Sequence, residues 1–393
     1  MRVAVLSSAS GGGAGIAAYR NYQAIKMYQS DNCSVDFIDV SLLDAVDPEV
    51  SPQISGSNHV YSNTHYTIDF ASFSRKHVIK TLQQYDVLNI HWCSFLLSIR
   101  ELLELAQSGI RLVFTLHDFY YMTGGCHYPA GCDQYKDECR LCPQVNIELM
   151  QKKDVQFAHL IKKEIFSLPN TFLTAPSEYI VNSAINAKII NKLRTKVVRN
   201  AYAPNDIGID NKKPVKELGL LLIADSFYEE RKNLKLAIDG LINFARSNRK
   251  QVVDRFVVHL VGRLDNEATQ LLEPHGIKCI IHGHVSEHVD LVRIYKTIDF
   301  ILTTSLDDNW PNILVEAGAY GVIPIVGPEH GCEEFILHSG VGHVFEKYNE
   351  YSLGNTLSNI KKDPESSKLI LKHVRETHDP EQVSREYLAF FKQ

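Results

Sequence analysis

The stretch DFILTTSLDDNWPNILVEAGAYGVIPIVGPEHGCEE, residues 299–334, decides the fold class of this chain. It begins with an apolar run rich in β-preferring residues, 300–304, which predicts a buried strand. After a polar turn, Pro311 suits the first turn of a helix, because its fixed φ is already helical and no amide donor is needed there. The helix is expected to end near Gly321, and a second strand, 322–326, follows at once. Strand, loop, helix and strand form the repeating unit of a parallel sheet, which binds ligands at the carboxyl ends of its strands.

Two carboxylates flank this loop, Asp308 before the helix and Glu316 one to two turns inside it. Between them, the free amides around Asn312 and Ile313 form a helix N-terminus, which attracts phosphate. Amides for a diphosphate and carboxylates for ribose and sugar hydroxyls suit a nucleotide sugar. The alternative is a capped helix with an unrelated acidic residue, and the spacing alone favours neither.

The same stretch resembles the donor-binding core of the retaining glycosyltransferases of family 4, which have the GT-B fold. The family hallmark is a carboxylate, seven residues, a glutamate, an Ala/Gly-rich turn, a strand and a Gly-x-x-Glu segment. In this chain it consists of Asp308, Glu316, Ala317, Gly318, Ala319, Gly321, Pro324, Gly331 and Glu334. Two positions depart from the family: Asp308 replaces the usual Glu, and His330 stands where Gly is frequent. Residues 308–312 resemble a subgroup that builds bacterial surface polysaccharides.

The composition is that of a globular protein large enough for two or three domains. The 393 residues are 45% apolar and 22% charged, and the net charge of −5 shows no footprint of nucleic-acid binding. The apolar run at 3–6 is too short for a signal peptide, and no run approaches the roughly 18 apolar residues of a membrane span. We therefore expect a cytoplasmic protein, with the inner face of the membrane as a candidate location, and reduced cysteines.

A glycine-rich segment, residues 11–15, lies between a predicted strand at 3–7 and a predicted helix at 16–28. Such a loop lets backbone amides approach a phosphate closely. It lacks the spacing of a dinucleotide fingerprint and an acidic residue placed to bind ribose. A glycine turn is often only a turn, but the family resemblance implies that Gly12 and Gly13 lie near the donor diphosphate.

His117 and Asp118 follow the predicted strand 112–116. A titratable pair at the end of a central strand is well placed for a role in a ligand site. The resemblance implies that His117 lies beside the donor sugar, and we expect Asp118 to orient its ring. The alternative is a structural histidine bonded to the neighbouring carboxylate beneath a loop.

Four of the eight cysteines fall within the loop 124–143: Cys126, Cys132, Cys139 and Cys142. The last two have the Cys-x2-Cys spacing of a zinc knuckle, and the loop has few apolar residues with which to order itself. We expect structural zinc here. Because all four ligands would be protein thiolates, the ion would have no open position for catalysis. Two disulfides or four free thiols are the alternatives.

Four lysines follow one predicted helix: Lys152, Lys153, Lys162 and Lys163. This pattern suits a peripheral contact with anionic lipid or with a lipid-diphosphate acceptor. A plain solvated helix face explains it equally well.

The second half of the chain begins a new alternation of strands and helices at a predicted strand, 219–224. Arg231 and Lys232 follow it, and two cations beside a diphosphate would stabilise a departing nucleotide. The family often has an arginine at the end of this strand, where this chain has Ser226. His284 lies in a segment that resembles the one whose backbone faces the nucleobase. An exposed basic turn is the alternative for the two cations.

Alternating strands and helices, twice over, predict an α/β protein of the GT-B class, with two doubly wound, Rossmann-like domains facing each other across a cleft. We expect an acceptor-side domain at 1–203 and a nucleotide-sugar domain at 204–378. Residues 379–393 are expected to form a terminal helix that crosses back to the first domain. The polar residues 44–66 predict a long loop.

The resemblance implies a retaining glycosyltransferase of the hexosyltransferase type, which needs no metal for catalysis. It would move a sugar from a UDP- or GDP-sugar to a hydroxyl of a saccharide or lipid-linked acceptor. The expected catalytic residues are His117, Asp308 and Lys232. The expected donor-binding residues are Gly12, Gly13, Arg231, Lys232, His284, Pro311, Asn312, Ile313, Glu316, Gly331 and Glu334. The alternatives are a catalytically degenerate binding protein of a polysaccharide assembly complex, and a nucleotide-sugar epimerase or phosphorylase of the same fold.

Overall fold

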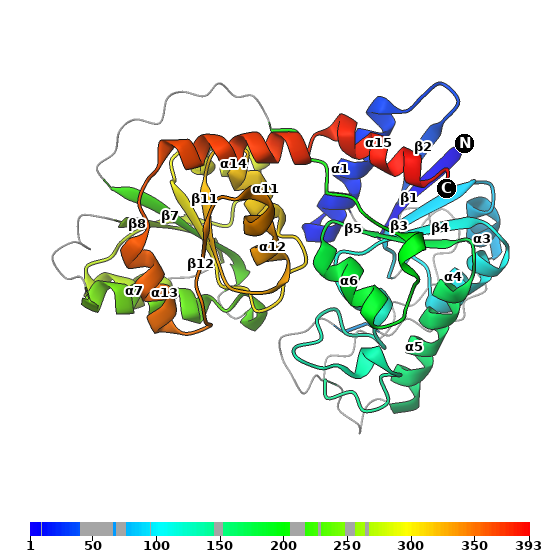
Figure 1. Ribbon diagram of the computed structural model, residues 1–393, viewed down its shortest axis with the longest axis horizontal. Helices are drawn as coiled ribbons and strands as arrows, with labels where there is room; N and C mark the ends of the chain where they lie inside the picture. Colours follow the sequence, from blue (N-terminus) through cyan, green and yellow to red (C-terminus); the bar gives the residue numbers. More distant parts are fainter. Residues whose placement is uncertain are drawn as a thin grey trace. The chain divides into compact units, whose positions relative to one another are not determined.

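The computed structural model describes residues 1–8, 10–39, 66–67, 76–94, 96–144, 152–204, 217–226, 229–247, 256–263 and 267–393 (Figure 1). These residues form two compact units. Unit 1 contains residues 1–201 and 378–393, and unit 2 contains residues 202–377. The limits predicted from the sequence, after residues 203 and 378, differ from these by two residues and one residue. The loop predicted at 44–66 lies outside the described residues, apart from Tyr66.

Unit 1 is built on a six-stranded parallel sheet with the strand order β2-β1-β3-β4-β5-β6. Its strands are β1 (Arg2–Ser7), β2 (Ser34–Ile38), β3 (Val87–Trp92), β4 (Arg111–Thr115), β5 (Thr171–Ala175) and β6 (Thr195–Val197). The chain runs from β1 outward to β2 and then returns past β1 to β3. The sheet is therefore doubly wound, as predicted, and it changes direction between β1 and β3, where such sheets bind ligands.

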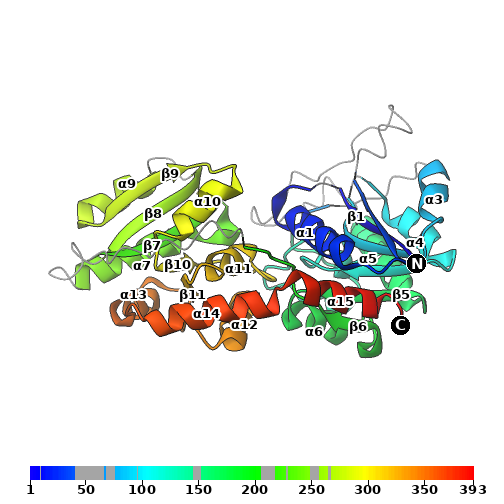
Figure 2. The ribbon, with the colours of Figure 1, turned by 90° about the horizontal axis from the view of Figure 1, so that it is seen from above.

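Helices cover both faces of this sheet. They are α1 (Gly12–Tyr28), α3 (Lys76–Leu82), α4 (Ile99–Gln107), α5 (Lys152–Ser167), α6 (Glu178–Asn186) and α15 (Pro380–Phe390). Alternate side chains of each strand enter different cores. Val3 and Val5 of β1 pack with α1 and α15, whereas Ala4 and Leu6 pack with the other helices. Figure 2 shows α1 and α15 side by side, so the C-terminal helix is part of unit 1.

Unit 2 repeats the plan with a second six-stranded parallel sheet, ordered β12-β11-β10-β7-β8-β9. Its strands are β7 (Leu218–Ser226), β8 (Phe256–Arg263), β9 (Lys278–Gly283), β10 (Phe300–Thr303), β11 (Ile323–Val326) and β12 (His343–Val344). The chain runs from β7 to one edge at β9 and then returns past β7 to β10. This sheet is also doubly wound, and it changes direction between β7 and β10.

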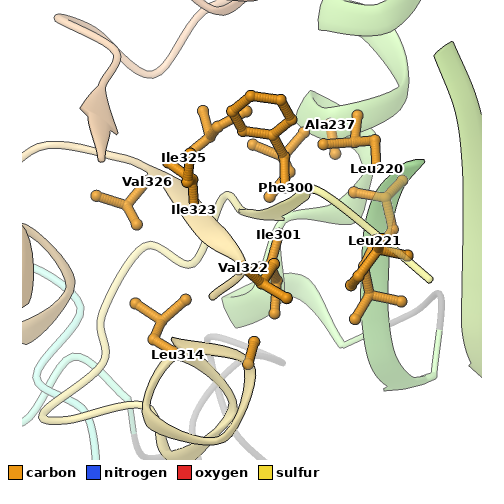
Figure 3. Close-up of a cluster of buried hydrophobic side chains, with 14 of the residues drawn as sticks. Leu220, Leu221, Ala237, Phe300, Ile301, Leu314, Val322, Ile323, Ile325 and Val326 are labelled. Carbon is orange, nitrogen blue, oxygen red and sulfur yellow. The ribbon is translucent and has the colours of Figure 1, made fainter. Parts of the chain in front are cut away.

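The helices of unit 2 are α7 (Leu234–Ser247), α9 (Glu267–Leu272), α10 (His288–Tyr295), α11 (Asn312–Gly318), α12 (His330–Ser339), α13 (Glu350–Asn359) and α14 (Pro364–Thr377). The core surrounds the strand of the stretch quoted first. Figure 3 shows Phe300 of β10 directed toward Ala237 of α7, while Leu314 of α11 lies on the other side of the sheet. All three side chains are 1% exposed or less, and every residue of β10 is buried, so this central strand is covered on both faces, as is usual in a parallel sheet.

Two helices begin at residues other than those predicted. Helix α1 begins at Gly12 rather than at 16, because Gly11 provides an extended cap and the small residues after it fit the first turn. Helix α11 begins at Asn312, since Pro311 has ψ 113° and caps the helix instead of joining its first turn. Among the described helices, none is long and apolar enough to cross a membrane.

Candidate functional site

Three predicted site residues meet in unit 2 at the carboxyl ends of β7 and β10, the strands between which the sheet changes direction. Asp308 follows β10, and Arg231 and Lys232 lie in a short 3-10 helix, Glu230–Lys232, after β7. The Asp308 Oδ2 atom accepts hydrogen bonds from Lys232 Nζ at 2.8 Å and from Arg231 Nη1 at 3.3 Å. We call these three residues the Asp308 cluster.

The Asp308 cluster is largely buried. The side chains of Asp308, Lys232 and Arg231 are 14%, 22% and 11% exposed. Burial by itself raises the pKa of the Asp308 carboxyl, but the two cations outweigh burial and hold that pKa below its ordinary value. Glu229 also accepts a hydrogen bond from Arg231, at 2.8 Å. A bound diphosphate would therefore compete with two carboxylates for the same N–H donors.

Backbone contacts tie the two loops of the cluster together. The Thr304 Oγ1 atom donates to the carbonyl oxygens of Lys232 at 3.1 Å or Asn233 at 2.8 Å. The Leu306 amide donates to the carbonyl oxygen of Arg231 at 2.8 Å. Asn233 has φ 50° and ends the 3-10 helix in the left-handed region. Because each loop is held by the other, the charged side chains are positioned in advance of any ligand.

The predicted Gly-x-x-Glu segment, residues 331–334, forms the first turn of α12 and packs against the cluster. The Gly331 amide donates to the Asp308 carbonyl at 2.9 Å, and a Cβ at Gly331 would lie 1.4 Å from the Asn309 carbonyl oxygen. Only glycine permits this approach. The two residues before it are strained: Glu329 has φ 68° and ψ 175°, and His330 has φ 60°. The left-handed backbone of His330 explains why glycine suits this position in the family that the sequence resembles.

Glu316 lies inside α11 and is 6% exposed. Its Oε2 atom accepts a hydrogen bond from the Tyr295 hydroxyl at 3.2 Å, a partner that the sequence pattern did not indicate. At the start of the helix, Pro311 is buried, and Asn312 and Ile313 are half-buried. The predicted carboxylate is therefore fixed by a buried tyrosine, within the helix that begins next to the Asp308 cluster.

Two further predicted donor-binding residues lie on other elements of unit 2. Glu334, in α12, is 11% exposed, and its Oε1 atom lies 3.7 Å from His338 Nε2. His284 is exposed and follows β9, the edge strand of the sheet. The sheet thus brings the members of the Asp308 cluster together but leaves His284 two strands away from β7.

In unit 1, His117 follows β4, but its partner is not Asp118. The His117 Nε2 and His91 Nδ1 atoms are 2.8 Å apart, and the two rings stack with centroids 5.1 Å apart. Asp118 instead accepts hydrogen bonds from His127 Nδ1 at 2.7 Å and from the Tyr120 amide at 2.8 Å. The prediction that Asp118 orients His117 is wrong, because the ring bonds to the neighbouring strand β3 while the carboxylate bonds to the loop that follows.

Burial keeps both rings of this pair neutral near pH 7. It lowers the pKa of His117 to about 4, against a smaller opposite effect of Asp118. It also lowers the pKa of His91 well below its ordinary value, and the His117 ring adds to this shift. For Asp118, burial raises the pKa, but His127 and other partners outweigh it and hold the pKa below its ordinary value. His117 is therefore a neutral hydrogen-bonding group rather than a cation.

The predicted glycines lie at a helix N-terminus rather than in a loop before one. Gly12 has φ 70° and, with Gly13, occupies the exposed first turn of α1. Within the described structure, apart from the neighbouring residues and the backbone of the helix itself, no heavy atom lies within 4 Å of a Cβ built at either position. The start of this 17-residue helix carries the positive end of the helix dipole.

The four cysteines of the predicted zinc site line one small cavity together with Tyr66: Cys126, Cys132, Cys139 and Cys142. No disulfide joins any of the eight cysteines. Burial raises the pKa of the Cys126 thiol well above its ordinary value and that of the Cys139 thiol to about 12. In the part of the chain that the structure describes, no three His, Cys, Asp or Glu side chains are arranged to hold a metal ion. The four thiols thus converge on one cavity without forming a coordination geometry.

The structure contradicts one member of the lysine face predicted on α5. Lys162 is 1% exposed, and its ammonium donates to the carbonyl oxygens of Tyr120 at 2.7 Å and Thr123 at 3.1 Å. Lys163 bonds to a carbonyl oxygen of the cysteine loop. The side chains of the two earlier lysines lie outside the described atoms. A buried ammonium cannot face a membrane, so Lys162 serves to hold the segment after β4.

Sequence reasoning missed Asn89 and His91 of β3, although the sequence contains a signal for them. On the sheet face that packs against α1, three strands change from apolar to polar residues at a similar level. In β3, Val87 is followed on this face by Asn89 and His91. In and after β4, Val113 is followed by Thr115 and His117, and in β5, Phe172 is followed by Thr174. A two-residue alternation that turns polar toward the carboxyl end marks a strand end that faces a ligand site.

Comparisons with known proteins define the fold class. The model of the family "Glycosyl transferases group 1" matches residues 212–376. Sucrose-phosphate synthase from Thermosynechococcus elongatus is similar over 100% of this chain and 98% of that chain, with a TM-score of 0.64 and 15% identity. Anabaena Alr3699/HepE, solved in complex with UDP and glucose, is similar over 100% and 99%, with a TM-score of 0.59 and 17% identity. The predicted GT-B fold is confirmed, and most of unit 2 matches a glycosyl transferase family model.

A curated relative comes from Escherichia coli (strain K12). Its description is "Putative colanic acid biosynthesis glycosyl transferase WcaC". It is 24% identical over 274 residues, which are 67% of this chain. This chain spans 64% of that relative's length.

Proposed function

We propose that this protein is a retaining glycosyltransferase. It moves a sugar from a nucleoside-diphosphate sugar to a hydroxyl of a saccharide or lipid-linked acceptor, in the synthesis of a bacterial surface polysaccharide. The observation that carries the proposal is the Asp308 cluster, which lies where the unit 2 sheet changes direction, inside the segment that matches the glycosyl transferase model. The descriptions of WcaC and of the HepE complex with UDP and glucose support the same class of reaction and donor.

In this proposal, unit 2 binds the nucleotide. Arg231 and Lys232 exchange the Asp308 carboxylate for oxygens of the diphosphate, because charge-assisted bonds to phosphate are at least as favourable. Asp308, released from Lys232, then accepts a hydrogen bond from a hydroxyl of the donor sugar. Glu316, which Tyr295 holds in place, binds the ribose.

The proposed reaction is a front-face substitution at the anomeric carbon. The acceptor oxygen bonds to that carbon on the face from which the diphosphate leaves, so the configuration is retained. The bond between the carbon and the phosphate oxygen breaks, the electron pair stays on the phosphate, and the acceptor's proton passes to it. Arg231 and Lys232 stabilise the charge that develops on the diphosphate. The neutral His117 makes a hydrogen bond and does not act as the general base.

Mass spectrometry after incubation with a panel of UDP- and GDP-sugars and saccharide or lipid-linked acceptors tests this function. We expect one sugar to be added to an acceptor with release of the nucleoside diphosphate, and proton NMR of the product to show the anomeric configuration of the donor. Lys232→Met should bind less nucleotide and release far less product. Donor conversion without any acceptor would indicate an epimerase or phosphorylase, and nucleotide binding without turnover would indicate a binding protein.

A structural zinc ion in the cysteine loop is the second part of the proposal. The four thiols line one cavity, which is the arrangement that a closed four-cysteine site needs before the metal draws the sulfurs together. Binding would release protons from thiols whose pKa burial now raises, and it would order a loop that has few apolar residues. The ion would hold the loop and take no part in the reaction.

Elemental analysis tests the zinc proposal. We expect about one zinc per chain, as one closed site requires, and loss of the metal in Cys139→Ser. Cys33→Ser, at a buried cysteine outside the loop, is the matched control and should keep the metal. A folded, metal-free preparation whose four loop thiols react with a thiol reagent would rule the ion out.

A further inference from the structure

A chain of hydrogen-bonded side chains runs through unit 1 from His117. His117 bonds to His91, whose Nε2 atom lies 3.0 Å from Asn89 Oδ1. Asn89 Nδ2 donates to the Val113 carbonyl at 3.1 Å and to Thr115 Oγ1 at 2.8 Å. Asn89 and His91 are 0% and 2% exposed. We call His117, His91, Asn89 and Thr115 the His117 chain.

At its far end, the His117 chain reaches the C-terminal helix of the same unit. Thr115 Oγ1 lies 2.8 Å from Thr174 Oγ1 and 3.4 Å from the Tyr387 hydroxyl of α15. Asn21 of α1 donates to the Tyr387 hydroxyl at 3.2 Å and accepts a bond from the Ala201 amide at 2.7 Å. Because these buried groups satisfy one another, the side chains are held in one arrangement.

The types of donor and acceptor decide which ring nitrogens carry protons. A carbonyl oxygen only accepts, so the Asn89 atom beside the Val113 carbonyl is the amide nitrogen, and the amide oxygen faces His91. That oxygen also only accepts, so His91 Nε2 carries a proton. Since the buried His91 ring is neutral, its Nδ1 atom has no proton and accepts from His117 Nε2. The neutral His117 ring then has its proton on Nε2 and a lone pair on Nδ1.

We propose that Asn89 and His91 are positioning residues that fix His117 in the Nε2–H tautomer, so that its Nδ1 atom accepts a hydrogen bond from a hydroxyl group of the substrate. His117 is only partly buried, and among the described residues its ring makes no hydrogen bond besides the one to His91. A sugar hydroxyl can donate to this nitrogen, whereas an ionised phosphate oxygen has no proton to donate. The site therefore selects hydroxyl groups over phosphate groups.

That the hydroxyl belongs to a sugar rests on the proposed function, whereas the tautomer itself does not. The sequence pattern by itself cannot supply this inference, because the partner that sets the tautomer lies on another strand. His91 lies 26 positions before His117 in the chain, and Asn89 two positions before His91.

Nitrogen-15 NMR of the full-length protein, labelled on histidine, measures the tautomer directly. Protonated and unprotonated ring nitrogens resonate in separate ranges, and their couplings to the ring protons distinguish Nδ1 from Nε2. The signals missing from the spectra of His117→Gln and His91→Asn assign the two rings. Near neutral pH, we expect both rings to be neutral, with Nε2 protonated and Nδ1 unprotonated. A proton on Nδ1 of His117, in a neutral or a charged ring, would overturn the inference.

Two substitutions of His91 test its positioning role. His91→Leu removes the acceptor, whereas His91→Asn can return an amide oxygen near the position of Nδ1. We expect His91→Leu to abolish the single tautomer of His117 and to lower kcat roughly five- to tenfold, the size of one hydrogen bond, with unchanged affinity for the nucleoside diphosphate alone. His91→Asn should keep the His117 signals and most of kcat. Equal losses of kcat in both variants, with unchanged His117 signals, would overturn the role.

Unit 2 offers a matched control. His259 Nδ1 lies 3.0 Å from His282 Nε2 in a second stacked pair, so His259→Asn makes the same change in the other unit. It should leave the His117 signals as they are. If His91→Leu does not fold, the spectrum of the unsubstituted protein still decides the tautomer. If the protein shows the expected tautomer but transfers no sugar, only the proposed function is contradicted. If it transfers sugar but His117 carries a proton on Nδ1, only this inference is contradicted.

Discussion

The Asp308 cluster of unit 2 and the His117 chain of unit 1 lie at corresponding places, the carboxyl ends of central parallel strands, but they are built differently. The Asp308 cluster consists of charged groups on two loops, joined by ion pairs and by backbone bonds between the loops. The His117 chain consists of neutral groups, most of them on strands, joined by hydrogen bonds inside the unit. One fold plan thus supports a charged site and a neutral site.

The difference follows from how each kind of group responds to burial. Burial raises the free energy of a charge, so the charges of the Asp308 cluster persist only because opposite charges face one another. The histidines of the His117 chain have no carboxylate partner strong enough to outweigh burial, and they lose their charge instead. A site of paired charges suits a diphosphate, and a site of neutral donors and acceptors suits hydroxyl groups.

The largest expected effect comes from displacing the backbone beside the Asp308 cluster. In Gly331→Ala, the new Cβ would lie 1.4 Å from the Asn309 carbonyl oxygen, so the turn must move away from Asp308. We expect a loss of about 3 kcal/mol in the free energy of unfolding, the upper part of the range for overpacking. Urea denaturation measures it. Gly13→Ala, at a glycine with open space around it, is the control, and an equal loss there would remove the steric explanation.

The contributions of the two sites to stability should be lost over different ranges of acid pH. The pKa of His117 is about 4 in the folded protein, against about 6.5 for a free histidine. Below pH 6.5, the unfolded chain binds a proton that the folded ring excludes, so this contribution to stability is complete above that pH and declines as the pH falls toward 4. The full shift of the His117 pKa corresponds to about 3 kcal/mol in the free energy of unfolding. Because the ring is partly exposed, we expect a loss of about 2 kcal/mol.

The pKa of Asp308 is lowered, so its contribution is present above the ordinary carboxyl range and is lost as the pH falls through its lower folded pKa. Urea denaturation between pH 7 and about pH 3 compares the two sites. His117→Gln should flatten the decline between about pH 6.5 and 4, and Asp308→Asn should change it only at lower pH. The same pH dependence in both variants would contradict the distinction between a neutral and a charged site.

Nucleotide affinity should depend on the charged residues of unit 2. Glu316→Gln removes the charge that we assign to ribose binding, and we expect it to weaken nucleoside diphosphate binding by about 1–3 kcal/mol, the range for a hydrogen bond to a charged group. Isothermal titration calorimetry with UDP and GDP measures the loss. The exposed Glu346 offers the matched control, Glu346→Gln, which should bind as before. Unchanged affinity of Glu316→Gln for both nucleotides would move the ribose site elsewhere.

The smallest expected effect on nucleotide affinity comes from a change in the His117 chain of unit 1. His117→Ala should change nucleoside diphosphate binding by less than about 0.5 kcal/mol, as expected for a residue that shares no partner with the groups assigned to the nucleotide. It should lower kcat with the true acceptor much more, because the lost hydrogen bond acts on the sugar in the transition state. Turnover equal to that of the unsubstituted protein would make His117 a structural residue.

The sequence by itself determined the layout of this protein. Apolar runs, glycines and Pro311 indicated strands and helices close to those observed, and they placed Asp308, Lys232 and His117 in the segments that follow strands. These features are local, because strand and helix periodicities and caps are encoded within one element and its neighbours. The order of elements then restricts the topology, since parallel strands with crossover helices have few arrangements.

Only the tertiary structure decided which side chains meet. His117 pairs with His91 rather than with its neighbour Asp118, and Lys162 enters the interior although its helix carries two pairs of lysines. The left-handed backbone of His330 was also not evident from its residue type. The physical reason is common to all three. Strand register, burial and the approach of distant loops set these partners, and a local sequence window contains none of them.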